Sequence, residues 1–212
     1  MQNDDGVQQV ESLLAGKRRI SHMEKKQPLS TSMFEARDFD VVKRAAEAGN
    51  AIAQTTLGKM YYEGQGVALD YAEALKWYKK AAEKGLSEAQ IMLGKMYHEG
   101  QGAARNHIEA MKWYRMATQN GFATAQYKFG MMYYHGEGVA QDYAEAAKWF
   151  CIAAETGIAE AQIILGKMYR EGQGVEQDYT EAKKWYRLAA EQGNVEAWNE
   201  LKTMFRAEWL KE

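Results

Sequence analysis

Apolar residues recur along the chain at helical spacing, in a pattern that returns every 36 residues. The stretch from Ala53 to Glu88 reads AQTTLGKMYYEGQGVALDYAEALKWYKKAAEKGLSE. Similar stretches begin at Ala89, Ala125 and Ala161, with no insertion between them. A repeat of this length indicates stacked supersecondary modules rather than one closed globule.

The first half of each unit predicts a helix that ends at a glycine turn. Ala53, Leu57 and Tyr61 lie near one face at helical spacing. Gly58 lies inside this helix, where glycine costs about 0.5–1 kcal/mol relative to alanine, and the same glycine returns in every unit. We therefore expect a neighbouring helix to approach too closely for a Cβ. Gly64 suits the left-handed position after a helix end.

The second half of each unit predicts a capped amphipathic helix. Asp70 and Glu73 form a capping-box pattern, in which the aspartate accepts from early N–H groups and the glutamate reaches back to the cap. Losing one such cap is expected to cost about 1 kcal/mol. The apolar stripe that follows contains Ala74, Trp77, Tyr78, Ala81 and Ala82. One hairpin cannot bury this stripe, so we expect neighbouring units to complete the core.

The repeat also predicts the domain organisation. We expect a flexible, basic N-terminal arm over residues 1–32 and a repeat solenoid over 33–212. The expected fold class is all-α, a right-handed α/α superhelical solenoid of stacked helix-turn-helix repeats, with about ten helices. The expected segments of the solenoid are a half-repeat 34–52, full repeats 53–88, 89–124, 125–160 and 161–196, and a C-terminal capping helix 197–212.

The order of motifs within the unit resembles a known repeat family. LG-xx-Y, G-x-G-V, D-Y-x-E-A, K-W-Y/F and AAE-x-G follow one another in each unit, and together they are similar to the Sel-1-like repeats. The departures are small: Ala103, Asn106 and Phe150 replace a valine, an aspartate and a tyrosine. That family is related to the tetratricopeptide repeats. The resemblance implies a non-enzymatic scaffold for protein interactions and suggests a bacterial source.

Composition narrows the function further. The net charge of −2 offers no electrostatic case for nucleic acid. Cys151 is the single cysteine of the chain, so no intrachain disulfide is expected. No run is long and apolar enough for a membrane helix, and the N-terminus lacks the apolar core of a secretion signal. We expect a cytoplasmic protein, with a periplasmic or secreted location as the alternative if a signal has been removed.

The expected binding surface comes from the resemblance. On tetratricopeptide scaffolds the first helix of each hairpin lines a concave groove. Lysines there are suited to the carboxylates of an acidic or C-terminal peptide, so the expected partner is a protein or peptide, acidic groups being one option. In the alternative interpretation these residues have no binding role, the lysines being solvated and the tyrosines partly packed. The expected groove residues are Lys59, Tyr62, Ile91, Lys95, His98, Tyr127, Met131, Tyr134, Lys167 and Arg170.

The third unit differs most from the others. Met131 replaces the groove lysine, Phe129 replaces a leucine, and Cys151 replaces a lysine or arginine. Two interpretations stay open: the unit is the apolar centre of a binding site, or these changes are neutral substitutions.

Motifs for chemistry are scarce. His98 and His135 lie on successive first helices, which suggests a zinc site, but no HExxH and no cysteine pair accompanies them. We therefore expect groove histidines and neither a metal nor a cofactor. Gly64-Gln65-Gly66 resembles half a phosphate loop, yet it follows a helix and lacks the Gly-Lys-Ser/Thr ending, which indicates a turn.

Two other function classes are the alternatives. Cysteine-rich relatives imply an enzyme of the β-lactamase or penicillin-binding kind, but this chain lacks their cysteine pairs and any Ser-x-x-Lys motif, and we expect no catalytic residues. A self-assembling structural protein is the other alternative, since exposed solenoid ends can stack. We expect a monomer or weak self-association.

Overall fold

The computed structural model describes the backbone of residues 31–209 and the side chains of residues 38–205. Nearly all of the expected arm over residues 1–32 lies outside this part, as do the side chains of Trp209 and Leu210. Within the described residues every regular element is an α-helix. This confirms the all-α class expected from the repeat.

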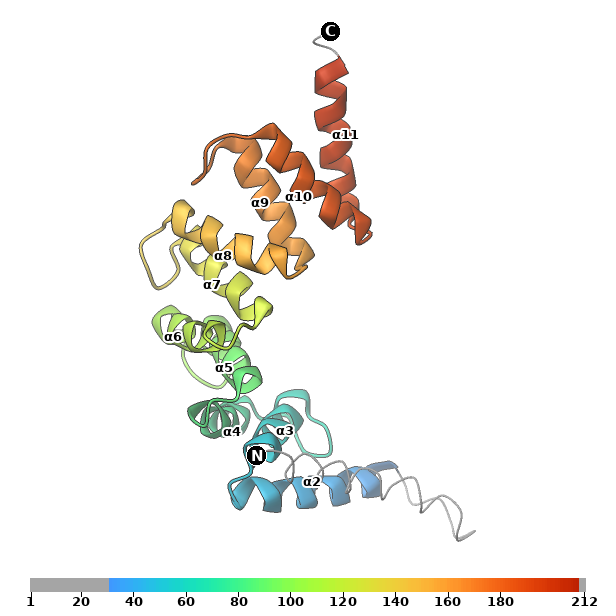
Figure 1. The fold of residues 1–212 in the computed structure, drawn as a ribbon. Coiled ribbons are helices and arrows are strands. Elements are labelled where there is room, and N and C mark those ends of the chain that lie inside the picture. Colours follow the sequence, from blue (N-terminus) through green and yellow to red (C-terminus); the bar gives the residue numbers. More distant parts are fainter. Residues whose placement is uncertain (1–30, 210–212) are drawn as a thin grey trace, which may run out of the picture. The chain divides into compact units, whose positions relative to one another are not determined.

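Four helix pairs form the repeating part of the fold, and Figure 1 shows them following one another in chain order. The helix α2 (Thr31–Glu47) precedes them and α11 (Val195–Trp209) follows. The first helices of the pairs are α3 (Ala51–Glu63), α5 (Ser87–Glu99), α7 (Ala123–His135) and α9 (Ala159–Glu171). The second helices are α4 (Tyr71–Glu83), α6 (His107–Thr118), α8 (Tyr143–Glu155) and α10 (Tyr179–Glu191).

The tryptophan of each second helix joins one unit to the unit before it. Trp77 packs with Ala46, Ala53 and Leu57, which belong to α2 and α3. Trp113 of α6 packs in the same way into a cluster made by α4 and α5. Each core is therefore built from neighbouring units, as expected from the stripe, and the stacked helical repeat is confirmed.

The recurring glycine inside each first helix lies against an aromatic ring. A Cβ added at Gly58 would stand 3.0 Å from the Tyr78 ring, and one added at Gly130 would stand 2.9 Å from Phe150. Both distances are tighter than ordinary van der Waals contact. The predicted close approach is thus confirmed, and the approaching group is the aromatic side chain of the second helix in the same unit.

The helix ends differ from expectation in one respect. Asp70 accepts from the N–H groups of Ala72 and Glu73, at 2.9 and 3.0 Å, as a cap should. The second half of the capping box is wrong, because the Asp70 N–H donates to the Tyr61 carbonyl of the preceding helix. Glu73 instead accepts from the indole N–H of Trp77, at 3.1 Å. The glutamate therefore orients the core tryptophan rather than the cap.

Candidate functional site

The expected groove residues lie on the four first helices, and most of them are half-buried. Lys59 and Lys167 are exposed, whereas Tyr62, Lys95, His98 and Arg170 are half-buried. The half-buried remainder, which packs against core clusters, comprises Ile91, Tyr127, Met131 and Tyr134. The alternative interpretation, in which the lysines are solvated and the tyrosines partly packed, therefore holds for part of this set, because several side chains contribute to packing.

One position in each first helix reaches into the following unit. Lys95 Nζ lies 5.3 Å from the centroid of the Tyr62 ring, which is in cation–π range. Tyr134 Oη donates to Gln173 Oε1 at 3.1 Å, and Arg170 forms an ion pair with Glu200. In the second unit the equivalent residue is His98, whose Nε2 lies 2.8 Å from Glu137 Oε2. These contacts connect the last turn of each first helix to the following unit, where the partner lies in the next first helix, in the turn after it, or in α11.

A pocket of about 260 Å³ opens between α5 and α7. Among its lining residues are three that the sequence placed in the groove, Lys95, His98 and Met131. The lining also includes Glu99 and His135, which lie on the expected first-helix face, and four residues that the sequence analysis missed, namely Tyr114, Lys128, Met132 and Glu137. We call this set the α5–α7 pocket. It brings together part of the expected groove and leaves out Lys59 and Lys167 at either side.

Charge and burial divide the α5–α7 pocket into a polar rim and an apolar base. Met132 is buried and Met131 half-buried, whereas Lys128 and His135 are exposed. The pKa of Lys95 is raised, first by its hydrogen bond with Tyr62, so this side chain stays charged at neutral pH. The polar rim carries Lys95 and Lys128 together with Glu99 and Glu137, so it offers charges of both signs around the methionines.

The third unit gives this pocket its apolar centre. In the other units a lysine and a glutamate stand one helical turn apart, as in the 4.0 Å ion pair of Lys59 with Glu63. In α7 these two positions hold Met131 and His135. At the third unit the face of the first helices therefore exchanges a lysine and a glutamate for a methionine and a histidine.

The histidines are arranged differently from the zinc hypothesis of the sequence. His98 stacks edge-on with His107, with ring centroids 5.1 Å apart, and bonds with Glu137. These three side chains, without His135, bring one ligand atom each to within 4.8 Å of one another.

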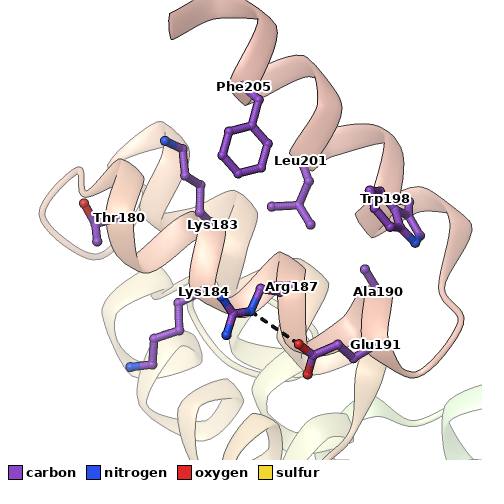
Figure 2. Close-up of a pocket in the computed structure, with 9 residues that line it drawn as sticks. All are labelled: Thr180, Lys183, Lys184, Arg187, Ala190, Glu191, Trp198, Leu201 and Phe205. Carbon is purple, nitrogen blue, oxygen red and sulfur yellow. Dashed lines mark ion pairs between the residues drawn. The ribbon is translucent and has the colours of Figure 1, made fainter.

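A larger pocket of about 640 Å³ lies between α10 and α11, and Figure 2 shows its lining. Trp198, Leu201 and Phe205 of α11 face the side of α10 that carries Lys183 and Arg187. One unit earlier, the equivalent side of α8 carries Ala147 and Cys151. Trp185 of α10 packs against that side of α8, in one hydrophobic core cluster.

Two charged residues that line this end pocket form ion pairs within α10 itself. Arg187 Nε lies 3.3 Å from Glu191, and Lys184 lies 3.0 Å from Glu181. These side chains thus have partners one turn away, and we place the candidate site at the α5–α7 pocket instead.

No helix among the described residues is long and apolar enough to cross a membrane.

Comparison with solved structures supports the fold and the repeat. A protective antigen of uropathogenic Escherichia coli strains, with an SLR fold, is 37% identical at a TM-score of 0.80, over 82% of this chain and 37% of that one. A Sel1 repeat protein from Oxalobacter formigenes is 37% identical at 0.72, over 80% and 49%. The chain therefore spans less than half the length of each. Cysteine-rich protein B of Helicobacter pylori, 22% identical at 0.51 over 63% and 96%, shares the fold.

A search among curated proteins finds no match. The family model for the Sel1 repeat, in contrast, matches four consecutive segments that cover well over half of the chain, namely residues 51–86, 87–122, 123–157 and 159–194. Each segment holds one helix pair, and the motifs noted in the sequence fall inside them. The chain belongs to the Sel1 repeat family.

Proposed function

We propose that this protein is a non-enzymatic scaffold that binds a segment of a partner protein across the α5–α7 pocket. The observation that carries the proposal is that Lys95, Lys128 and His135 line one pocket together with Met131. Sel1 repeats mediate protein interactions, and repeat proteins bind through positions that vary between otherwise similar units. The positions of Met131 and His135 vary in this way.

The chemistry of the pocket favours a segment with one apolar side chain and neighbouring carboxylates. Methionine is flexible and polarisable, so it adapts to the shape of an apolar anchor. The ammonium groups of Lys95 and Lys128 are suited to carboxylates beside that anchor. Glu137 is engaged with His98, which reduces its repulsion of such a partner.

The stacked repeat itself supplies the variants for a test. Met131→Lys introduces the residue that its counterparts Lys59, Lys95 and Lys167 carry, and Lys128→Glu reverses an exposed rim charge. Lys128 is exposed, and the half-buried position of Met131 holds lysine in the other three units, so the helical signal and the melting temperature should stay near those of the wild type. We expect a partner captured by the wild-type chain to be lost by the double variant Met131→Lys/Lys128→Glu.

The matched control places the same charge reversal on a second helix. Lys79 is exposed on α4 and lies outside the α5–α7 pocket, so Lys79→Glu should retain the partner. Calorimetric titration of the captured protein into each variant gives the affinities. Equal affinity for the wild type and the double variant would refute the proposed site, even with the partner known.

A further inference from the structure

We propose that His98, His107 and Glu137 form a site for a divalent transition-metal ion, with Zn²⁺ as the physiological candidate. Each residue offers one ligand atom, and these atoms lie within 4.8 Å of one another. Two imidazoles and one carboxylate are a ligand set that zinc proteins use when one coordination position stays open. The site is defined by its own ligands and does not depend on the proposed partner.

The stacking of the units brings these residues together. His98 lies in the last turn of α5, His107 is the first residue of α6, and Glu137 stands in the turn after α7. A Cβ added at Gly138 would lie 2.7 Å from the carbonyl carbon and oxygen of His107. Only a glycine permits this approach, and its φ of +74° adds a second reason for glycine. The turn of the third unit is thereby held against the second.

The neighbouring units show what these three positions ordinarily hold. One unit earlier they are Tyr62, Tyr71 and Gln101, and one unit later Tyr134, Tyr143 and Gln173. The two tyrosines stack edge-on in both, with ring centroids 5.2 and 5.1 Å apart. At the junction of the second and third units all three positions change together, and each new residue has a side chain that binds metals.

A purely structural substitution explains part of this change. The His98–Glu137 contact replaces the Tyr134–Gln173 hydrogen bond, and the stacked imidazoles replace stacked phenols. It does not explain Nδ1 of His107, which is buried and has no hydrogen-bond partner among the described residues. A buried polar atom without a partner is costly, and a bound ion is one recognised reason for its presence.

The geometry fits metal coordination after small side-chain movements. Ligand bonds to zinc of 2.0–2.1 Å in a tetrahedral arrangement place the ligand atoms roughly 3.3 Å apart. The observed 2.8 Å between His98 and Glu137 is below this spacing, and the 4.8 Å limit for the group is above it. The carboxylate supplies the negative charge that a dication requires. All three side chains are half-buried, so the ion has both access from solvent and partial shielding from it.

Cobalt titration tests the site directly, because tetrahedral Co²⁺ has a visible d–d absorption band. The full chain is first treated with a chelator and dialysed, and Co²⁺ and then Zn²⁺ are added without any partner protein. We expect the band to saturate at one equivalent of Co²⁺ and to disappear when Zn²⁺ displaces it. Calorimetry with Zn²⁺ alone should give the same stoichiometry.

The repeat again offers variants that preserve the fold. His98→Tyr, His107→Tyr and Glu137→Gln introduce the residues of the neighbouring units, and each should abolish the band while leaving the helical circular dichroism unchanged. His135→Glu is the matched control, because Glu63, Glu99 and Glu171 occupy that position elsewhere. This control should keep the band. Absence of the band in the wild type, its persistence in the combined variant His98→Tyr/His107→Tyr/Glu137→Gln, or its loss in His135→Glu would each overturn the proposal.

Discussion

At the scale of single residues, two glycines with similar backbone conformations distinguish two effects of an alanine substitution. One effect is the strain of a positive φ, and the other is a clash of the added Cβ with neighbouring atoms. Gly138 and Gly157 have φ of +74° and +96°, so alanine at either position is strained by about 1–2 kcal/mol. At Gly157 an added Cβ would meet nothing within 4 Å, whereas at Gly138 it would meet the His107 backbone.

We therefore expect Gly138→Ala to lower the free energy of unfolding clearly more than Gly157→Ala does. Urea denaturation of both variants measures the difference. Equal losses would mean that the turn of the third unit moves away from α6 without cost, which would also weaken the argument for the His98–Glu137 geometry.

Cys151 is a second residue whose environment predicts behaviour. Its pKa is raised, first by burial and then by the negative charge of Glu155, to which its thiol donates at 3.6 Å. The thiolate is the reactive form of cysteine, so alkylation by iodoacetamide near pH 8 should be slower than that of an unstructured cysteine peptide. Glu155→Gln should accelerate the alkylation a few-fold, and an unchanged rate would show that Glu155 does not contribute to the raised pKa of Cys151.

At the scale of the helix, the caps are a quantitative test. Asp70→Ala removes the acceptor for two N–H groups at the start of α4 and should cost about 1 kcal/mol of unfolding free energy. Asp70→Asn retains an acceptor, as Asn106 does at α6, and should cost much less. Chemical denaturation compares the two, and equal losses would contradict the role of the side chain.

The same helices show what the sequence can and cannot predict. The cap aspartate and the glycine at the helix end follow from local rules, because their hydrogen bonds involve residues only a few positions away. The role of Glu73 was predicted wrongly, since the indole of Trp77 competes for its carboxylate one turn later. Local rules name the residues that interact but do not rank two partners at similar spacing.

The candidate site was predicted less completely than the helices. The repeat and the resemblance identified Lys95, His98 and Met131, which do meet in the α5–α7 pocket. Glu137 was missed because it lies in the turn of the next unit, 39 residues after His98, and its proximity depends on how units stack. A comparison of equivalent positions contains a usable signal, since Glu137 replaces a glutamine of the other units.

At the scale of the whole molecule, three buried tyrosines predict a loss of stability at high pH. Burial raises the pKa of Tyr78, Tyr114 and Tyr186 far above the ordinary value of about 10. The folded state therefore keeps protons that the unfolded chain releases. Stability should be full below about pH 10 and should fall as the pH rises above it.

Urea unfolding near pH 8 and near pH 11 measures this effect. Tyr78→Phe introduces the residue that Phe150 provides in the third unit, so it should preserve the packing and reduce the loss between the two pH values. The triple replacement by phenylalanine should reduce the loss further. A loss of the same size in the triple variant would show that other groups cause it.

The contacts between units have one further consequence, which concerns the order of the units. Tyr134 meets Gln173, and His98 meets Glu137, so each pair joins residues of consecutive units. Removal of the third unit as a whole block of 36 residues would keep the stacking surfaces compatible but would place Gln173 beside His98. A function that depends on such a pair therefore belongs to the junction between two consecutive units and not to either unit alone. Two chains made of the same units in different orders would share a fold and differ in function.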